Sequence, residues 1–301
     1  MTTQSTPAPE ILIVFNPLAG SARRDQLRHL INLHFVDRSI EWLEVAEGSD
    51  TKASIKPYLE RGVHLVIVAG GDGTISSAAA AMANSNVPMG ILPIGTGNVL
   101  ARELAIPINL NKAAKLLATD FSVRRLDAIR VADRLYLLAV GVGLSALTMR
   151  RTRTKDKQRF GRLAYLSAFL LSLVGLPQHD FELVVDGEPL TVRANELMAV
   201  NAGAIGYKTL RWGPNVRPDD GSLDLCFIRV RTVWHFIQVF FGILSRQEFR
   251  SGRLKCITVR ESIQIESPDE LLVQGDGDLI GQTPITLTLL PSALKIAVPR
   301  K

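Results

Sequence analysis

The sequence has few of the residues that build disulfide frameworks, metal centres or membrane spans. Only two of its 301 residues are cysteines, Cys226 and Cys256, which show neither a metal-ligand spacing nor a disulfide framework, so a reducing cytoplasm is expected. The N-terminus MTTQSTPAPE lacks the pattern of a signal peptide. Apolar stretches at 163–176 and 234–244 fall short of the roughly 18 to 20 residues that span a bilayer. We therefore expect no transmembrane helix.

Outside one segment, the sequence has no excess of positive or negative charge. Lys and Arg number 35 against 29 Asp and Glu, a net charge of +6, and residues 150–162 alone account for that excess. The neutral remainder argues against nucleic-acid binding. The basic segment precedes an amphipathic stretch at 165–173, a combination that can dock on an anionic bilayer. A solvated loop before a core helix explains the same segment equally well.

The first 125 residues alternate apolar runs with helical patterns in a globular composition of 47% hydrophobic residues. ILIVF at 11–15, VHLVIVA at 63–69 and PMGIL at 88–92 are apolar throughout, which is typical of strands covered on both faces. Each run leads into a turn and a helical pattern. This alternation predicts an N-terminal doubly wound α/β domain with a parallel sheet.

From about residue 126 the sequence reads as short strands joined by turn residues. Helical patterns remain near 160–175 and 232–244. We predict an α/β domain at 1–125 and a mainly antiparallel β domain at 126–294, and leave open a return of residues 295–301 to the first domain.

Three turns follow the predicted parallel strands, where α/β sheets bind their ligands. They are NPLAG at 16–20, GGDGT at 70–74 and GTGN at 95–98. Glycines let a ligand approach the backbone, and helix N-termini favour anions. Thr74 is expected at the N-cap of its helix. Together the turns predict a polyphosphate site, although an Asp-Gly turn that only caps a helix is the plainer alternative.

Other phosphate motifs are absent. The sequence has no G-x-x-x-x-G-K-[ST] loop and no H-R-D-x-x-x-x-N loop, and Leu100 stands where a dinucleotide motif needs a third glycine. A different kind of nucleoside triphosphate site remains.

Five segments carry a family resemblance. They are the first two turns, PIGTGNVLAREL at 93–104, GPNVRPDDGSLDL at 213–225 and GDGDLIGQTPITLTLLPSALKIAVP at 275–299. They resemble the bacterial diacylglycerol kinase family of lipid kinases, which is related to NAD kinase. The resemblance covers nearly the whole chain. It implies an NAD kinase-like nucleotide domain, a C-terminal β-sandwich domain, an active site in the cleft between them, and transfer of the γ-phosphoryl group of ATP to a lipid hydroxyl, with diacylglycerol the leading acceptor.

The resemblance also assigns roles to residues. Asp72 is expected to orient the phosphates through Mg²⁺, and Asp278 to be the base in place of the family's usual glutamate. The Asp220 carboxylate and the carbonyls of Arg217 and Ser222 match the family's metal loop, with the oxygen ligands that Mg²⁺ prefers. The expected nucleotide contacts are Asn16, Pro17, Gly20, Gly70, Gly71, Asp72, Gly73, Thr74, Ile75, Ser76, Thr96 and Asn98.

Two departures from the family pattern stand out. Val99 occupies a position where some members carry aspartate, and 43–51 shows no obvious match to a threonine that contacts ATP in relatives, so that contact is left unassigned. The alternatives are a kinase of a soluble acceptor such as NAD and a non-catalytic phosphate-binding or membrane-recruited module. The expected partners are a lipid substrate and, peripherally, the anionic inner face of the cytoplasmic membrane. A homodimer is left open.

Overall fold

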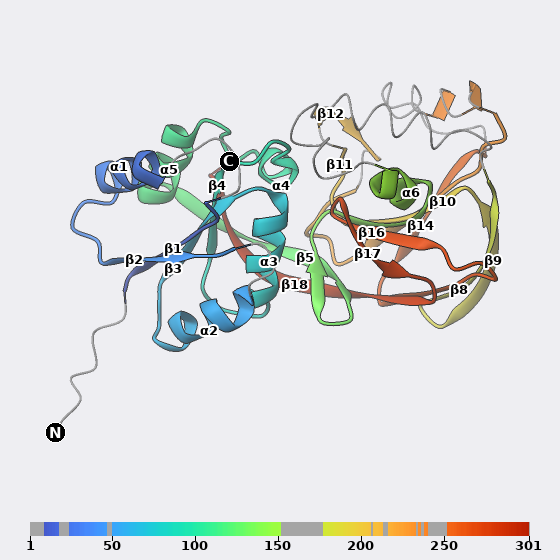
Figure 1. The fold of residues 1–301 in the computed structure, drawn as a ribbon, viewed down its shortest axis with the longest axis horizontal. Helices are drawn as coiled ribbons and strands as arrows, with labels where there is room; N and C mark the ends of the chain where they lie inside the picture. Colours follow the sequence, from blue (N-terminus) through green and yellow to red (C-terminus); the bar gives the residue numbers. More distant parts are fainter. Residues whose placement is uncertain are drawn as a thin grey trace. The chain divides into compact units, whose positions relative to one another are not determined.

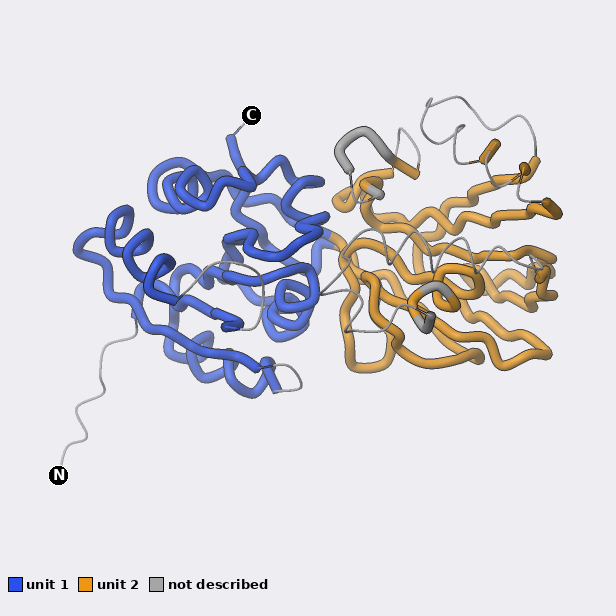
Figure 2. The backbone as a smooth tube through the Cα atoms, turned by 45° about the horizontal axis from the view of Figure 1, so that its top comes forward, with its two compact units in different colours: residues 1–126, 292–301 blue, residues 127–291 orange. Residues whose placement is uncertain are grey.

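The computed structural model describes residues 9–17, 24–46, 50–151, 177–205, 207–212, 216–232, 234–235, 238–239 and 252–300. The chain divides into two compact units (Figure 2): unit 1 holds residues 1–126 and 292–301, and unit 2 holds residues 127–291. Gly20, most of the basic segment, the amphipathic stretch and most of the helical pattern at 232–244 lie outside the described residues.

Unit 1 contains a parallel sheet in the order β2-β1-β3-β4-β18. Its strands are β1 (Ile11–Phe15), β2 (Ile40–Glu44), β3 (Leu65–Gly70), β4 (Met89–Pro93) and the last part of β18 (Ile285–Pro299). Strands β1, β3 and β4 are buried along their whole length because helices cover both faces, which explains their uninterrupted apolar sequences. The predicted parallel α/β domain is confirmed.

Figure 1 shows α1 (Arg24–His34) and α5 (Leu110–Thr119) on one side of this sheet, and α2 (Thr51–Glu60) and α3 (Asp72–Met82) on the other. The helices turn apolar stripes inward; in α1, Leu27 and Ile31 lie one turn apart and are both buried. The short helix α4 (Val99–Glu103) follows β4.

Unit 2 is a β-sandwich, as predicted. One sheet has the order β18-β15-β8-β9, with β5 and β6 attached to β18, and the other has the order β14-β13-β10-β7-β16-β17. Residues from both sheets, including Phe181, Leu225 and Leu287, form one buried cluster. The bounds are β5 (Phe121–Val131), β6 (Arg134–Tyr136), β7 (Ala139–Gly143), β8 (His179–Val185), β9 (Glu188–Ala194), β10 (Glu196–Val200), β13 (Leu223–Ile228), β14 (Leu254–Val259), β15 (Ser262–Glu266), β16 (Leu272–Gly275) and β17 (Asp278–Gln282). Helix α6 (Leu144–Arg151) follows β7, and β11 (Ala204–Ile205) pairs with β12 (Tyr207–Arg211).

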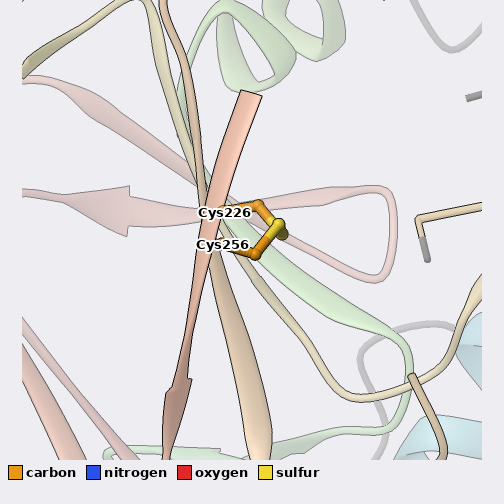
Figure 3. Close-up of a disulfide and its surroundings, with 2 residues drawn as sticks. All are labelled: Cys226 and Cys256. Atoms are coloured by element: carbon orange, nitrogen blue, oxygen red, sulfur yellow. A yellow bond between two sulfur atoms is a disulfide. The ribbon is translucent and has the colours of Figure 1, made fainter. Parts of the chain in front are cut away.

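The two cysteines form a disulfide, Cys226–Cys256 (Figure 3). The expectation that they do not is wrong, because the antiparallel register of β13 and β14 places them directly opposite each other, with 4.0 Å between their Cα atoms. Pairing between strands 30 residues apart was not visible in the spacing alone. Since disulfides are rare in the cytosol, the cysteines do not support the expected reducing compartment.

Two strands cross the boundary between the units. Strand β5 passes from unit 1 to unit 2 after Leu126, and β18 returns to unit 1 at Ser292. Residues 285–288 of β18 pair with β15, whereas Ile296 pairs with Met89 of β4. Unit 1 therefore needs the C-terminal end of the chain to complete its sheet.

Candidate nucleotide site and the loops of unit 2

The three predicted turns follow strands that are neighbours in the sheet, β1, β3 and β4. Backbone hydrogen bonds join the strand ends: Asn16 N–H donates to the Ala69 carbonyl at 3.3 Å, and Ile94 N–H donates to the Gly70 carbonyl at 3.2 Å. The carboxyl ends of parallel strands lie at one edge of a sheet. Those residues that the sequence predicts as nucleotide contacts, and that the structure describes, therefore lie together at this edge of the sheet.

The GGDGT segment begins α3 earlier than expected. Gly71, not Thr74, is the N-cap, and the helix starts at Asp72. The expectation for Thr74 is wrong because its side chain lies inside the first turn, where it packs on Gly70; a methyl group at Gly70 would lie 2.4 Å from the Thr74 Cβ. Asn16 Nδ2 donates to Thr74 Oγ1 at 3.4 Å, so Thr74 also ties the first turn to the second.

Gly71 and Gly95 bring the second and third turns into direct contact. A methyl group at Gly95 would lie 2.5 Å from the Cα of Gly71, so only glycine fits there. Asn98 has a left-handed backbone and donates its side-chain amide to the Gly95 carbonyl at 2.7 Å, which fixes the third turn. Its buried Oδ1 has no hydrogen-bond partner. The backbones of the second and third turns therefore meet beside the first turn of α3.

The Asp72 carboxylate reaches across to the third turn. It accepts a hydrogen bond from the Leu100 N–H at 3.3 Å, at the start of α4. Burial raises the pKa of Asp72 above its usual value, although the backbone N–H groups of Leu100, Val99 and Asn98 oppose that rise. Asp72 therefore holds the two turns together.

The other expected nucleotide contacts differ in what they can offer. The first-turn N–H groups of Gly73 and Thr74 have no carbonyl acceptor within the helix, whereas the Asp72 N–H donates to its own carboxylate. Ile75 donates its N–H to the Gly71 carbonyl and buries its side chain completely, so neither group is available to a ligand. Pro17 and Thr96 are exposed, and Ser76 is half-buried.

The GDGD segment forms the hairpin between β16 and β17. Asp276 and Gly277 have positive φ values of 50° and 95°, which suits a tight hairpin turn. The Asp276 carboxylate accepts hydrogen bonds from the N–H groups of residues 137–139 at 2.8 to 3.1 Å, and is therefore structural. Asp278 is the first residue of β17, and its side chain is exposed. The hairpin therefore presents Asp278 to solvent from a fixed backbone.

The Asp220 loop is also fixed from within unit 2. Gly221 donates its N–H to the Asp127 carboxylate at 2.7 Å, and Ser222 donates both its N–H and its hydroxyl to Asp220. Burial, and to a smaller degree the charge of Asp220, raise the pKa of Asp224. An oxygen-only donor set suits a hard cation. Within the described part of the chain, however, no three His, Cys, Asp or Glu side chains gather as metal ligands.

Glu196 was not identified from the sequence. It is buried in β10, where its carboxylate accepts hydrogen bonds from the Ser145 N–H at 2.8 Å and the Ser145 hydroxyl at 2.5 Å. Burial raises the pKa of Glu196 to about 8. Gly141 leaves the space that these groups fill, since a methyl group there would lie 2.8 Å from the Glu196 Oε1. Glu196 therefore anchors the start of α6 to the sheet.

The fold defines a two-unit protein that combines a parallel-sheet α/β unit with an antiparallel β-sandwich unit. Residues 10–131 match the model of the diacylglycerol kinase catalytic domain, and residues 138–298 match that of the YegS C-terminal NAD kinase beta sandwich-like domain. The chain belongs to the bacterial diacylglycerol kinase family of lipid kinases. It is thus a lipid kinase, and membership of a kinase family implies the use of ATP and a lipid substrate.

Similar proteins align over almost the whole chain. A Mycobacterium tuberculosis (strain CDC 1551 / Oshkosh) protein named "Diacylglycerol kinase" is 26% identical over 97% of this chain and 96% of its own length. A Klebsiella pneumoniae (strain 342) protein named "Probable lipid kinase YegS-like" is 28% identical over 97% and 96%. A crystal structure described as a diacylglycerol kinase from Bacillus anthracis str. Sterne shares the fold, with a TM-score of 0.74, 22% identity and 98% coverage of both chains. No helix in the described residues is long and apolar enough to cross a membrane.

Proposed function

We propose that this lipid kinase transfers the γ-phosphoryl group of ATP to the hydroxyl of diacylglycerol. The observation that carries the proposal is the contact between Gly71 and Gly95, which brings two glycine turns together at the ends of adjacent parallel strands, where a backbone with few side chains lets an anion approach. The name of the Mycobacterium tuberculosis relative supports diacylglycerol as the acceptor.

The nucleotide phosphates would lie against the first turn of α3. The free N–H groups there and the positive end of the helix dipole attract anions. Asn16 and Thr96 lie on the flanking turns and supply polar side chains, while Asp72 keeps the turns in register. A bound Mg²⁺ would neutralise charge on the phosphates, and we propose Asp72 as the residue that holds it.

Asp278 is our proposed base. The acceptor oxygen attacks the γ-phosphorus, its proton passes to the Asp278 carboxylate, and the bond from the γ-phosphorus to the bridging oxygen breaks to release ADP. The exposed side chain on the β16–β17 hairpin is free to meet a substrate hydroxyl. Aspartate is one methylene shorter than the family's glutamate, so the acceptor must approach this hairpin more closely.

We propose further that the Asp220 loop holds a structural Mg²⁺ through the Asp220 carboxylate and the carbonyls of Arg217 and Ser222. The hydrogen bonds of Asp127 and Ser222 already shape the loop, which supports this assignment. We also propose that the protein acts peripherally at the inner face of the membrane, because its acceptor would reside in the membrane and its ATP in the cytoplasm.

The test is phosphoryl transfer from γ-labelled ATP to three acceptors: vesicles that contain dioleoylglycerol, a total lipid extract, and NAD. We expect labelled phosphatidic acid from the vesicles and no labelled NADP. Label on another lipid of the extract, with none on dioleoylglycerol, would overturn the proposal that diacylglycerol is the acceptor. Nucleotide binding without any transfer would support the non-catalytic module instead.

Asp278→Asn tests the base. It should lower turnover by about 10² to 10⁴ because the amide cannot accept the proton, while nucleotide affinity stays the same. Asp133→Asn is the matched control, since Asp133 is an exposed turn aspartate of the same unit. Equal turnover of the two variants would remove Asp278 from the mechanism.

A further inference from the structure

Four of the six described residues that line a hollow of about 490 Å³ in unit 2 are arginines. Its described lining residues are Gln178, Arg193, Arg229, Arg231, His235 and Arg253. None of these residues belongs to the GGDGT, GDGD or Asp220 segments. The hollow is therefore a feature separate from the proposed catalytic groups.

The backbone around the hollow is fixed by a buried asparagine. Asn195 accepts a hydrogen bond from the Val230 N–H at 2.6 Å and donates to the Pro177 carbonyl at 2.9 Å, so the segment before β8 is held against the end of β13. Arg229 N–H donates to the Arg253 carbonyl at 2.8 Å. The arginines are thus held at neighbouring positions by the framework of the sandwich.

Among the described residues, little negative charge compensates the arginines of the hollow. Asp180 lies 3.7 Å from Arg193 in a solvent-exposed pair, which is worth little. No acidic side chain in the described residues pairs with Arg229, Arg231 or Arg253. Like charges that line one hollow repel one another, and an anion with several charges relieves that repulsion.

An exposed tryptophan is the sequence neighbour of one residue of the hollow. Trp234 directly precedes His235 of the hollow and is 64% exposed. Tryptophan concentrates at membrane–water interfaces because its ring is apolar and its N–H is polar. Arg229, Arg231 and an exposed tryptophan three residues further along the chain fit a surface that is both anionic and partly apolar, whereas a small soluble phosphate would make no use of the indole.

We propose that the surface formed by Arg193, Arg229, Arg231, Trp234, His235 and Arg253 docks on an anionic phospholipid bilayer. The inference rests on the proposed function in one respect, since diacylglycerol resides in a bilayer. It assigns membrane contact to residues other than the basic segment at 150–162.

Vesicle sedimentation tests the proposal with the full chain and no ATP. The double variant Arg229→Gln/Arg231→Gln should bind vesicles of phosphatidylcholine with phosphatidylglycerol about 30-fold more weakly than the unmodified chain, at about fivefold for each charge removed. The matched control is Lys112→Gln/Lys115→Gln, two exposed cations on α5. Equal losses in the two double variants would overturn the proposal.

Tryptophan fluorescence supplies a second measurement that needs only a conservative change. Emission should shift to shorter wavelength when phosphatidylglycerol vesicles are added, and Trp234→Phe should abolish most of that shift. An undiminished shift in Trp234→Phe would place the contact elsewhere. Glycerol 3-phosphate should neither cause the shift nor displace the vesicles; if it does either, the ligand is a soluble phosphate and the bilayer proposal fails.

Because neither experiment measures turnover, a failure here is distinguishable from a failure of the proposed function. A chain that binds anionic vesicles through this surface and phosphorylates no lipid keeps the docking proposal. A chain that phosphorylates diacylglycerol in detergent, with vesicle binding unaffected by the arginine changes, keeps only the proposed function.

Discussion

Asp72 has both a structural contact in the fold and a proposed role in holding Mg²⁺. Its carboxylate accepts the Leu100 N–H at the start of α4, and burial raises its pKa. A residue with only a capping role would tolerate replacement by a neutral acceptor of the same shape. A residue that must carry negative charge toward Mg²⁺ would not.

Asp72→Asn separates these roles. The amide oxygen can still accept the Leu100 N–H, so we expect the free energy of unfolding to fall by only about 1 kcal/mol. Kinase activity should fall by roughly 10² or more through the loss of charge near the phosphates. Thermal melting and the labelled-ATP assay check the two expectations, with Asp25→Asn, an exposed first-turn aspartate of α1, as the control. A variant that unfolds would leave Asp72 a purely structural role.

Glu196 makes the stability of the protein depend on pH. Its pKa is about 8 in the folded chain against 4.5 for the ordinary carboxyl, so the folded state binds a proton that the unfolded state has released. Stability from this group is therefore greatest below the unfolded pKa and decreases as the pH rises toward 8, by about 1.4 kcal/mol for each pH unit in that window.

Glu196→Gln should remove this dependence. The amide has the shape of the protonated carboxyl and can both accept the Ser145 N–H and donate to the Ser145 hydroxyl. Between about pH 6 and pH 8 the melting temperature of the unmodified chain should fall by roughly 5 to 10 °C more than that of the variant. Parallel melting curves across that range would contradict the assignment.

Among elements, the second and third turns of unit 1 depend on a contact between two glycines. Gly95→Ala places a methyl group 2.5 Å from the Gly71 Cα, and the turns must separate to admit it. We expect a loss of about 1 to 3 kcal/mol in stability together with weaker nucleotide binding. Gly71→Ala is the matched control because its methyl group would lie 3.4 Å from Gly95, an ordinary contact. Denaturant titration should rank Gly95→Ala as the less stable variant.

The sequence predicted the strands that are covered by helices on both faces of the sheet. ILIVF and LVIVAG are buried throughout, so helical coverage on both faces leaves an unbroken apolar run that identifies the strand. Strand β2 (IEWLE) and strand β5 (FSVRRLDAIRV) mix polar and apolar residues, and the sequence did not reveal them. The start of α3 was misplaced because Thr74 is a good N-cap residue by type, whereas packing against Gly70 decides its position.

The site could be predicted only where local sequence carries its chemistry. Asn16, Gly71, Asp72 and Gly95 lie in turns whose glycines are visible in the sequence. Glu196 lies in an ordinary strand, and its partner Ser145 is 51 residues away. The Cys226–Cys256 pair likewise depends on the register of β13 and β14. Such contacts come from tertiary structure, and spacing does not contain them.

At the scale of the whole molecule, the chain leaves unit 1 and returns to it. The returning residues 292–301 bury Ala293, Leu294, Ile296, Ala297 and Val298. Asn84 N–H donates to the Ala293 carbonyl at 2.8 Å, and Arg300 pairs with Asp120 at 2.8 Å. The sequence left this return open because the apolar pattern of a strand does not specify which neighbouring strand it pairs with.

A chain that ends at Pro291 should therefore lose the fold of unit 1. The three larger buried side chains alone contribute roughly 1.5 to 3 kcal/mol each, which is comparable to a total stability of about 5 to 15 kcal/mol. Ile296→Ala is the milder version and should cost about 2 to 5 kcal/mol, whereas Lys295→Ala beside it should cost much less. Nucleotide binding and thermal melting measure the loss; an unchanged melting curve for Ile296→Ala would show that the returning strand is dispensable.

The Cys226–Cys256 bond closes the intervening chain into a covalent ring within unit 2. A protease that cuts once between the two cysteines opens the ring but releases no fragment. The nicked molecule should keep its full mass and run as a single species in a non-reducing gel, and separate into two pieces once a thiol is added. Limited digestion followed by paired gels would therefore locate cleavage sites inside the ring and distinguish them from cuts elsewhere in the polypeptide.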